Sequence, residues 1–279
     1  MPFAENQAAR IYWDEQGQGA PVLLIMGLGY PSDLWHRTRP LLAANYRTLA
    51  LDNRGIGRSE APMGPCSISL MAEDVRSVLD AARVEQAHII GVSMGGMIAQ
   101  EFALRYPRRV QSLVLGCTQA GGLHAVPAAP SVLLALMSRP NLTPDQAAEL
   151  FIPILYDPST PRQRVEEDMA ILRAWPPHPL VFAAQLQAIV AWEAYSRLPQ
   201  IAAPTLVIHG GSDRLIPPRN GELIAARIPR ARLVMIAGAG HMLATDQPEP
   251  THRALTEFLA RVEQARESSP AVPAAENSG

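Results

Sequence analysis

Residues 87–96 read AHIIGVSMGG, and this stretch decides how the rest of the chain is interpreted. The first six residues form a short apolar run typical of a buried strand, and residues 94–106 have the pattern of a helix. The motif G-x-S-x-G joins the two, with Ser93 at its centre. Glycines permit a sharp turn there, which holds the Ser93 hydroxyl at the carboxyl edge of a sheet and near the positive end of the helix. We therefore expect Ser93 to be a nucleophile, although the bare motif recurs by chance in about one chain in ten of this length and Ser93 could simply cap the helix.

Five further apolar runs around this stretch resemble buried strands, and helical patterns alternate with them. The runs cover residues 21–27, 46–52, 110–115, 204–209 and 231–237, and the helices 70–83, 94–106, 220–228 and 250–264. Because the runs are continuous in Val, Ile and Leu, they suit strands covered on both faces, as in parallel sheets. The order predicts an α/β fold with a mostly parallel central sheet flanked by helices, whose ligands gather at the carboxyl ends of the strands.

One segment interrupts this alternation. Between residues 118 and 198 no buried strand is recognisable, and helical patterns occur at 144–152 and 164–175 among many prolines. An insertion of this size after the strand near residue 115 predicts a helical cap over an active site. We expect a core formed by residues 1–118 and 200–265, a helical cap at 119–199, and a disordered Ser/Pro/Ala-rich tail at 266–279.

The composition excludes several classes of function. All 24 basic residues of the 279-residue chain are arginines, so no lysine can form a Schiff base or serve a phosphate-binding P-loop. The net charge of −2 argues against nucleic acid as a partner, and two cysteines are too few for a disulfide framework or a cysteine-built metal site. Without a visible secretory signal or an apolar run of about 20 residues, we expect a cytoplasmic protein that neither enters membranes nor carries a cofactor or metal.

A serine nucleophile needs a general base, and His241 is the best placed of the seven histidines. It follows the run 231–237 in a glycine-rich loop, which puts it at the same sheet edge as Ser93. The other histidines have positions that suit structural or peripheral roles: His36 in an early helix, His88 inside a strand, His209 at a strand end as structure or pocket wall, His252 at a solvated helix position, and His124 and His178 in the cap.

The base in turn needs a carboxylate to orient it, and Asp213 is the natural candidate. It ends the sequence HGGSD after the run 204–209, again at the carboxyl edge, although it could also be a simple turn residue. Asp52 also follows a strand, but its loop, DNRGIGRS at 52–59, has the arginines and glycines of an internal brace. The chain order Ser, Asp, His is that of one fold among the known triads.

Two backbone amides are expected to stabilise a developing oxyanion. Met94, directly after the nucleophile, supplies one, and Leu28 in the turn MGLG at 26–29 supplies the other, because its glycine neighbours let the amide turn into a cavity. We expect substrate contacts from residues that flank these positions and from a cap aromatic: Tyr30, Leu215, Met242 and Trp175. The alternative for Trp175 is packing within the cap, where aromatic residues lie more often than they touch substrate.

Together these motifs resemble the α/β-hydrolase superfamily, near its serine esterase and enol-lactonase branch. The resemblance covers nearly the whole chain, with five motifs in the family's order: MGLG at 26–29, where methionine replaces the usual histidine, DNRGIGRS at 52–59, GVSMGG at 91–96, HGGSD at 209–213 and GAGH at 238–241. It implies the triad Ser93, Asp213 and His241, the oxyanion amides of Leu28 and Met94, and a cap at about 119–200.

The resemblance also implies a cofactor-free serine hydrolase that cleaves small or medium carboxylic esters through an acyl-serine. Enol-lactone hydrolysis is the nearest alternative, because residues 91–100 (GVSMGGMIAQ) are similar to enol-lactonases. Carbon–carbon bond hydrolases and perhydrolases fit less well, since the 26–29 turn lacks the pattern of the former and the tryptophan typical of the latter. Dehalogenases and epoxide hydrolases of this fold use aspartate where this chain has Ser93. A receptor that binds a small apolar ligand in the same cavity is the alternative from a different class.

Overall fold

The computed structural model describes residues 2–268, and its centre is a sheet of eight strands in the order β1-β2-β4-β3-β5-β6-β7-β8. The strands are β1 (Phe3–Asn6), β2 (Ala9–Gln16), β3 (Ala20–Ile25), β4 (Tyr46–Leu51), β5 (Ala87–Val92), β6 (Val110–Gly116), β7 (Thr205–Gly210) and β8 (Ala231–Ile236). The pairs β1–β2 and β2–β4 are antiparallel and all the others are parallel. The predicted fold class, a mostly parallel α/β sheet, is therefore confirmed.

Strand β3 shows why its apolar run is continuous, because neighbouring residues enter the cores on opposite faces of the sheet. Leu23 and Ile25 pack with residues of α2 (Ile68–Ala81), α3 (Met94–Arg105) and α8 (Arg219–Arg227). Val22 and Leu24 pack on the other face with residues of α1 (Arg39–Ala43), α9 (Leu243–Asp246) and α10 (Pro248–Glu267). All four side chains are fully buried. Helices on both faces leave the carboxyl edge of the sheet as the place for a site.

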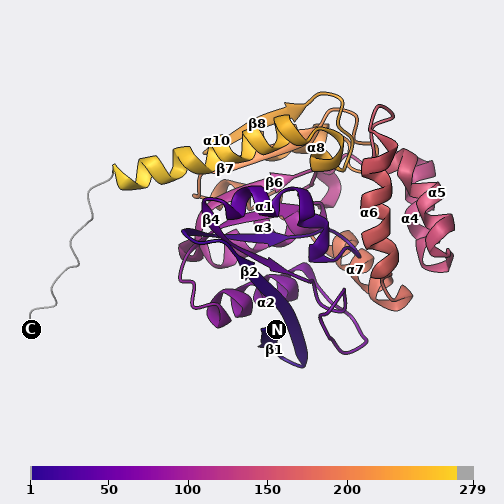
Figure 1. Cartoon of the computed structure of the whole chain (residues 1–279), viewed down its shortest axis with the longest axis horizontal. Helices are drawn as coiled ribbons and strands as arrows, with labels where there is room; N and C mark the ends of the chain where they lie inside the picture. Colours follow the sequence, from indigo (N-terminus) through magenta and orange to yellow (C-terminus); the bar gives the residue numbers. More distant parts are fainter. Residues whose placement is uncertain (1, 269–279) are drawn as a thin grey trace, which may run out of the picture.

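The segment between β6 and β7 is helical, and we call residues 119–199 the cap segment. It contains the helices α4 (Pro130–Ser138), α5 (Pro144–Leu155), α6 (Arg162–Ala174) and α7 (Pro179–Ala191) and the short 3-10 helices η3 (Gly122–His124) and η4 (Arg139–Asn141). A third 3-10 helix, η5 (Leu198–Gln200), overlaps its end. Its four α-helices gather at one side of the sheet (Figure 1). Residues of α4, α5 and α6 share a small apolar core of their own. None of the described helices is long and apolar enough to cross a membrane.

Several elements differ from the sequence prediction. The β1–β2 hairpin was not predicted, because β2 (ARIYWDEQ) lies near the sheet edge and mixes polar with apolar residues. Helices α4 and α7 were not predicted either, since their sequences are apolar nearly all round and show no helical period. Helix α10 runs to Glu267, so the first residues of the expected tail at 266–279 are helical, while residues 269–279 lie outside the described part of the chain.

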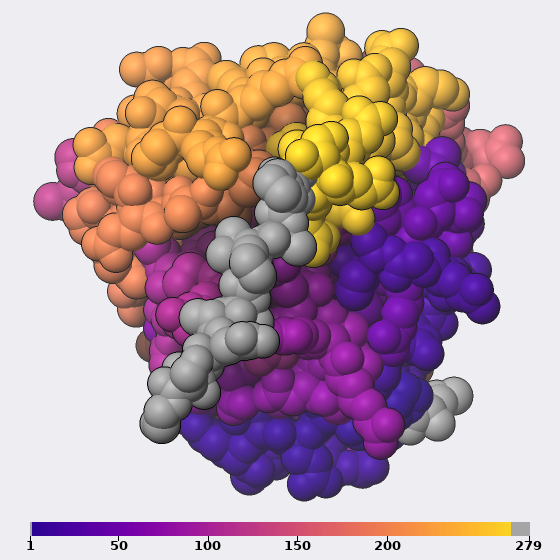
Figure 2. Space-filling view, turned by 90° about the vertical axis from the view of Figure 1, so that its left-hand side faces the viewer, coloured from indigo at the N-terminus to yellow at the C-terminus, as the bar shows by residue number. Residues whose placement is uncertain are grey.

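Figure 2 shows the face that is turned away from the cap segment. On this face the end of α10, in yellow, lies beside N-terminal residues in indigo and violet. Helix α10 also contacts the residue that follows η1 (Ser32–Arg37), since His252 Nε2 lies 3.3 Å from Thr38 Oγ1. His252 is therefore half-buried, and the solvated position expected for it is wrong. Burial lowers the pKa of His252, and the nearby Glu249 opposes this shift.

Candidate active site

Ser93 sits at a strained turn between β5 and α3. Its backbone has a φ of 57° and a ψ of −123°, a region that residues other than glycine rarely adopt. The turn is possible because glycines flank it: a Cβ on Gly91 would lie 2.1 Å from Gly95 O, and one on Gly95 2.2 Å from Ile25 O. The Ser93 N–H donates to Gly116 O at 2.8 Å, which ties the turn to β6. The sharp turn lifts the Ser93 side chain to the carboxyl edge of the sheet.

Asp213 and His241 meet at the same edge, from the loops after β7 and β8. His241 Nδ1 lies 2.8 Å from Asp213 Oδ2, and the other carboxylate oxygen accepts hydrogen bonds from Leu215 N and Ile216 N, both at 2.9 Å. Burial alone would raise the pKa of Asp213, but the charges and hydrogen bonds of His241 and His209 outweigh burial and hold this pKa well below its ordinary value. Asp213 is therefore ionised at neutral pH, and it fixes the imidazole so that Nε2 is the atom left for a substrate.

His209 supports this acid, a contact that the sequence did not reveal. Its Nε2 lies 2.9 Å from Ile216 O and 3.4 Å from Asp213 Oδ2. One ligand atom each of Cys117, His209 and Asp213 lies within 4.8 Å of the others, which is compact enough to consider a metal ion. However, the Asp213 carboxylate is already occupied by protein donors, and burial raises the pKa of the Cys117 thiol, which disfavours the thiolate that a metal requires. We interpret this group as the hydrogen-bonded surroundings of the acid.

Ser93 and His241 line one cavity between the sheet and the cap segment. The core contributes Leu28, Tyr30, Leu215 and Met242 to its wall, and the cap segment contributes mainly apolar side chains, among them Phe151 and Phe182. Within residues 2–268 no hydrogen bond joins the Ser93 hydroxyl to His241, a contact that often tightens only when a substrate is bound. The three candidate triad residues thus reach the same place from three strand ends.

The turn at 26–29 is held from both sides. Asn53 Nδ2 donates to Met26 O at 2.8 Å, and Gln185 Oε1 of α7 accepts from Gly29 N at 3.1 Å. Among the described residues the amides of Leu28 and Met94 donate to no protein acceptor, and Leu28 lines the cavity. Gln185, which is 1% exposed, was not a sequence candidate, because nothing in its local pattern links α7 to a turn 156 residues away.

The cap segment also holds the loop of His241. Leu155 O, at the end of α5, accepts from His241 N at 2.7 Å and from Met242 N at 3.2 Å. Asp246 Oδ2 accepts from Gly240 N at 2.7 Å, and Asp246 Oδ1 accepts from Thr160 Oγ1 at 2.5 Å. Burial raises the pKa of Asp246 to about 6, although these hydrogen bonds oppose the shift. The imidazole is thus positioned by contacts from the core and from the cap segment.

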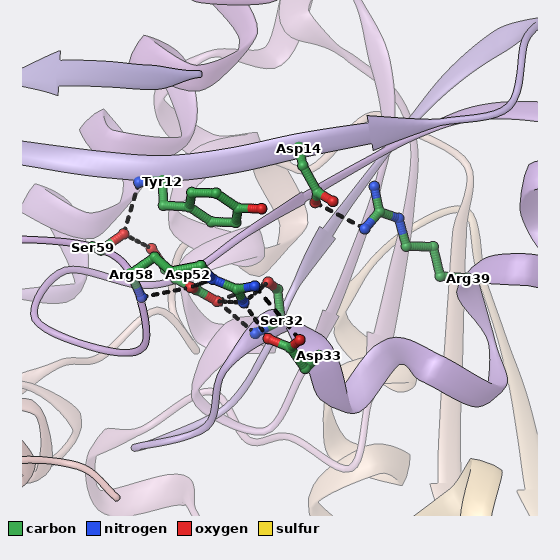
Figure 3. A network of polar contacts seen from close by, with 8 residues as sticks. All are labelled: Tyr12, Asp14, Ser32, Asp33, Arg39, Asp52, Arg58 and Ser59. Carbon is green, nitrogen blue, oxygen red and sulfur yellow. Dashed lines mark hydrogen bonds and ion pairs between the residues drawn. The ribbon is translucent and has the colours of Figure 1, made fainter. Parts of the chain in front are cut away.

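Asp52, the alternative acid, is occupied elsewhere. Its Oδ1 accepts from Ser32 N and Ser32 Oγ, both at 2.7 Å, and its Oδ2 accepts from Arg58 N at 2.9 Å and Arg58 Nε at 2.8 Å (Figure 3). Arg58 also pairs with Asp33, and Ser59 Oγ donates to Asp52 O. The loop at 52–59 therefore braces the core beneath the site.

Three of the four residues expected to contact the substrate line the cavity, and one does not. Tyr30, Leu215 and Met242 line the cavity, whereas Trp175 is absent from its wall. Trp175 follows the last residue of α6, and its ring lies under the Arg58 guanidinium at 5.1 Å from the ring centre. Its placement as a cavity residue is therefore wrong, because its ring packs against a cation of the brace instead. Phe151 and Phe182 are cap aromatics that do reach the cavity.

Most of the chain resembles known hydrolases. The profile of the alpha/beta hydrolase fold family matches residues 20–248. A putative carbamate hydrolase, RutD of Azorhizobium caulinodans, is 33% identical over 95% of this chain and 100% of its own length. Among solved structures, a thermophilic esterase from Thermogutta terrifontis matches with a TM-score of 0.81 and 27% identity, covering 94% of this chain and 98% of the esterase. The enol-lactonase from Burkholderia xenovorans LB400 matches with a TM-score of 0.83 and 25% identity, covering 93% and 100%. With its fold, its sharp serine turn and these relatives, the chain belongs to the α/β-hydrolase family.

Proposed function

We propose that this chain is a serine hydrolase that cleaves carboxylic esters through an acyl-serine intermediate. The observation that carries the proposal is the 2.8 Å contact between His241 Nδ1 and Asp213 Oδ2, on an imidazole that lines the same cavity as Ser93. The likeness to an esterase of known structure supports this choice of substrate.

The mechanism follows from these positions. His241 Nε2 takes the proton of the Ser93 hydroxyl while Ser93 Oγ attacks the ester carbonyl carbon, and Asp213 stabilises the imidazolium that forms. The amides of Leu28 and Met94 donate to the negatively charged oxygen of the tetrahedral intermediate. His241 then protonates the leaving alcohol, and an acyl-serine remains. A water molecule, deprotonated by His241, attacks this acyl group and releases the acid.

Lactone hydrolysis is the second candidate, because the enol-lactonase of Burkholderia xenovorans LB400 aligns with 93% of this chain. A lactone is an internal ester, so the same groups would act on it, and the two candidates differ only in which substrate the cavity accepts. A carbamate is the third substrate to assay, because the RutD relative is named a putative carbamate hydrolase.

The test compares Ser93→Ala with wild type on a substrate panel. The panel contains 4-nitrophenyl butyrate, an enol-lactone, a 4-nitrophenyl carbamate and a vinylogous diketone, so that ester, lactone, carbamate and carbon–carbon bond cleavage are separated. Ser93→Ala should lower kcat on the preferred substrate by at least about a thousandfold. The control is Ser131→Ala, which removes an exposed hydroxyl of α4 and should not change turnover.

Labelling by a fluorophosphonate probe gives an answer that does not depend on the substrate. The probe should modify wild type and Ser131→Ala but not Ser93→Ala. Turnover near the wild-type rate by Ser93→Ala would contradict the proposal. Absence of labelling in the wild type, together with tight binding of a non-ester ligand, would favour the receptor alternative.

A further inference from the structure

Two arginines line the otherwise largely apolar cavity, and their surroundings differ. Arg173 of α6 has an acidic partner, since its Nε lies 3.2 Å from Asp145 Oδ1. Arg139, in η4 between α4 and α5, has none: among the described residues no carboxylate lies within ion-pair distance of its guanidinium, and its side chain makes no hydrogen bond. Arg139 is therefore a cation facing the cavity without a compensating anion.

The neighbours of Arg139 offer little compensation for its charge. The ring of Phe182 lies 5.8 Å from the guanidinium carbon, near the outer limit of a cation–π contact. Burial lowers the pKa of Arg139, and among the described residues the one effect that opposes this shift comes from Tyr30, whose phenol carries no charge at neutral pH. Burial, together with a smaller effect of the Asp168 charge, raises the pKa of Tyr30 to about 12, although Arg139 opposes this shift, so the phenol keeps its proton at neutral pH.

Tyr30 adds a second donor beside Arg139. Within residues 2–268 its hydroxyl has no hydrogen-bond partner, and its side chain lines the same cavity. Tyr30 lies two residues after Leu28, so the pair connects the cap segment with the turn that carries a candidate oxyanion amide. A guanidinium and a phenol O–H, both lacking protein acceptors, form a donor set complementary to a carboxylate.

We propose that Arg139 and Tyr30 form a carboxylate-binding subsite, and that the substrate is an ester or lactone that also carries a free carboxylate. The inference rests on the proposed function for the reacting bond, but it concerns a different part of the substrate. Arg139 suits this role because its planar guanidinium binds a carboxylate through two parallel hydrogen bonds. The apolar side chains around the pair favour an aliphatic or aromatic body between the carboxylate and the ester.

Binding is tested in a Ser93→Ala background, where turnover does not interfere. The probes are the monomethyl esters of succinate, glutarate, adipate and pimelate, each compared by calorimetry with its neutral dimethyl ester. At least one monomethyl ester should bind about 10- to 100-fold more tightly than its dimethyl counterpart, because a hydrogen-bonded charge pair forms only with the free acid. Adding Arg139→Gln should remove this preference while changing affinity for the dimethyl ester by less than about threefold.

Three further variants separate charge from shape. Arg139→Lys should retain part of the preference, because the charge stays while the bidentate geometry is lost. Tyr30→Phe should weaken binding of the monomethyl ester alone, by about tenfold or less. Arg162→Gln is the matched control, since it removes an α6 arginine whose side chain is 92% exposed, and it should behave as the parent.

The outcomes distinguish failure of this inference from failure of the proposed function. If wild type is labelled at Ser93 and hydrolyses esters, but no probe shows a charge preference that Arg139→Gln removes, the carboxylate subsite is wrong and the hydrolase stands. If Ser93 is neither labelled nor required for turnover, the hydrolase is wrong, while a preference lost in Arg139→Gln still supports the subsite. In wild type the expected kinetic signature is a lower KM for mono-4-nitrophenyl adipate than for its methyl ester, and its loss in Arg139→Gln.

Discussion

Asp213 receives protein donors on both carboxylate oxygens, and this explains why it stays ionised while its side chain is fully buried. The amides of Leu215 and Ile216 hold one oxygen, and His241 and His209 hold the other. Removing the charge leaves the imidazole without its orienting acceptor. The position of the proton on His241 therefore depends on this one side chain.

Asp213→Asn should lower kcat by about 10³- to 10⁴-fold, because an amide does not stabilise the imidazolium and can favour the wrong tautomer of His241. KM should change far less, since Asp213 does not line the cavity. Steady-state kinetics on the best ester measure both parameters. Asp80→Asn, which removes a half-exposed carboxylate paired with Arg76, is the control and should leave kcat unchanged. A kcat within tenfold of wild type in Asp213→Asn would reject the assignment of the acid.

The residues predicted from sequence and those missed differ in one physical respect. Ser93, Asp213 and His241 each follow a recognisable strand, so the chain direction alone places them at the carboxyl edge. Gln185 and Asp246 act through contacts that depend on how the cap segment docks, and no local pattern reports such contacts. The sequence therefore predicted the candidate chemistry but not the side chains that hold it in place.

The raised pKa of Asp246 implies that the unfolding free energy of the chain depends on pH, and it fixes the direction of that dependence. Its pKa is about 6 in the folded chain against 3.8 ordinarily, so between these values the folded state binds the proton more readily than the unfolded state. The contribution of Asp246 to stability is therefore fully present below about pH 4 and is lost as the pH rises through about 6. Asp246→Asn removes this titration. Between about pH 4.5 and 7, the unfolding free energy of wild type should fall by about 1 to 2 kcal/mol relative to the variant. Denaturant unfolding of wild type and Asp246→Asn at both pH values measures this change. If the difference in unfolding free energy between the two proteins is the same at both pH values, the expectation is contradicted.

At the scale of the elements, the turn from β5 to α3 depends on backbone contacts that exclude side chains. A Cβ on Gly95 would lie 2.2 Å from Ile25 O and 2.7 Å from Met26 O, both of them backbone atoms of the sheet and the adjoining turn. Neither atom belongs to a flexible side chain, so β3 or α3 would have to shift. Strand β5 and helix α3 are well predicted from the sequence because the motif G-x-S-x-G marks the turn between them. The sequence of the β1–β2 hairpin contains no such motif.

Gly95→Ala should therefore destabilise the chain by about 3 kcal/mol or more, or prevent folding, and lower turnover by displacing Ser93. Gly211→Ala is the control, because a Cβ there has its nearest contact at 3.4 Å from Ile236 O, an ordinary packing distance. Thermal unfolding and soluble yield of the two variants provide the comparison. If Gly95→Ala and Gly211→Ala are equally stable, the close approach of β3 and α3 does not exclude a side chain at position 95.

At the scale of the whole molecule, one buried carboxylate joins the cap segment to the core. Asp168 of α6 is fully buried and accepts hydrogen bonds from Tyr156 Oη at 3.1 Å and from Thr245 Oγ1 at 2.6 Å. Arg37 Nη2 and His36 Nε2 of η1 lie 3.3 and 3.5 Å from its other oxygen. Because Thr245 lies in α9, four residues after His241, the docking of the cap segment and the position of the imidazole depend on the same side chain.

Asp168→Asn should destabilise the chain by about 3 to 5 kcal/mol, because it removes the buried charge that pairs with Arg37 and places an amide NH2 group either against that guanidinium or against the two hydroxyl donors. Its neighbour Glu167 provides a matched control, since it also pairs with Arg37, at 2.7 Å, but with a side chain that is 44% exposed. Glu167→Gln should leave the unfolding free energy nearly unchanged, as solvent screens an exposed pair. Turnover should fall in Asp168→Asn and not in Glu167→Gln, because only the former loosens both walls of the cavity. Denaturant unfolding and ester kinetics on the two variants test this, and equal effects of both would mean that the cap segment docks through surface charge rather than through the buried carboxylate.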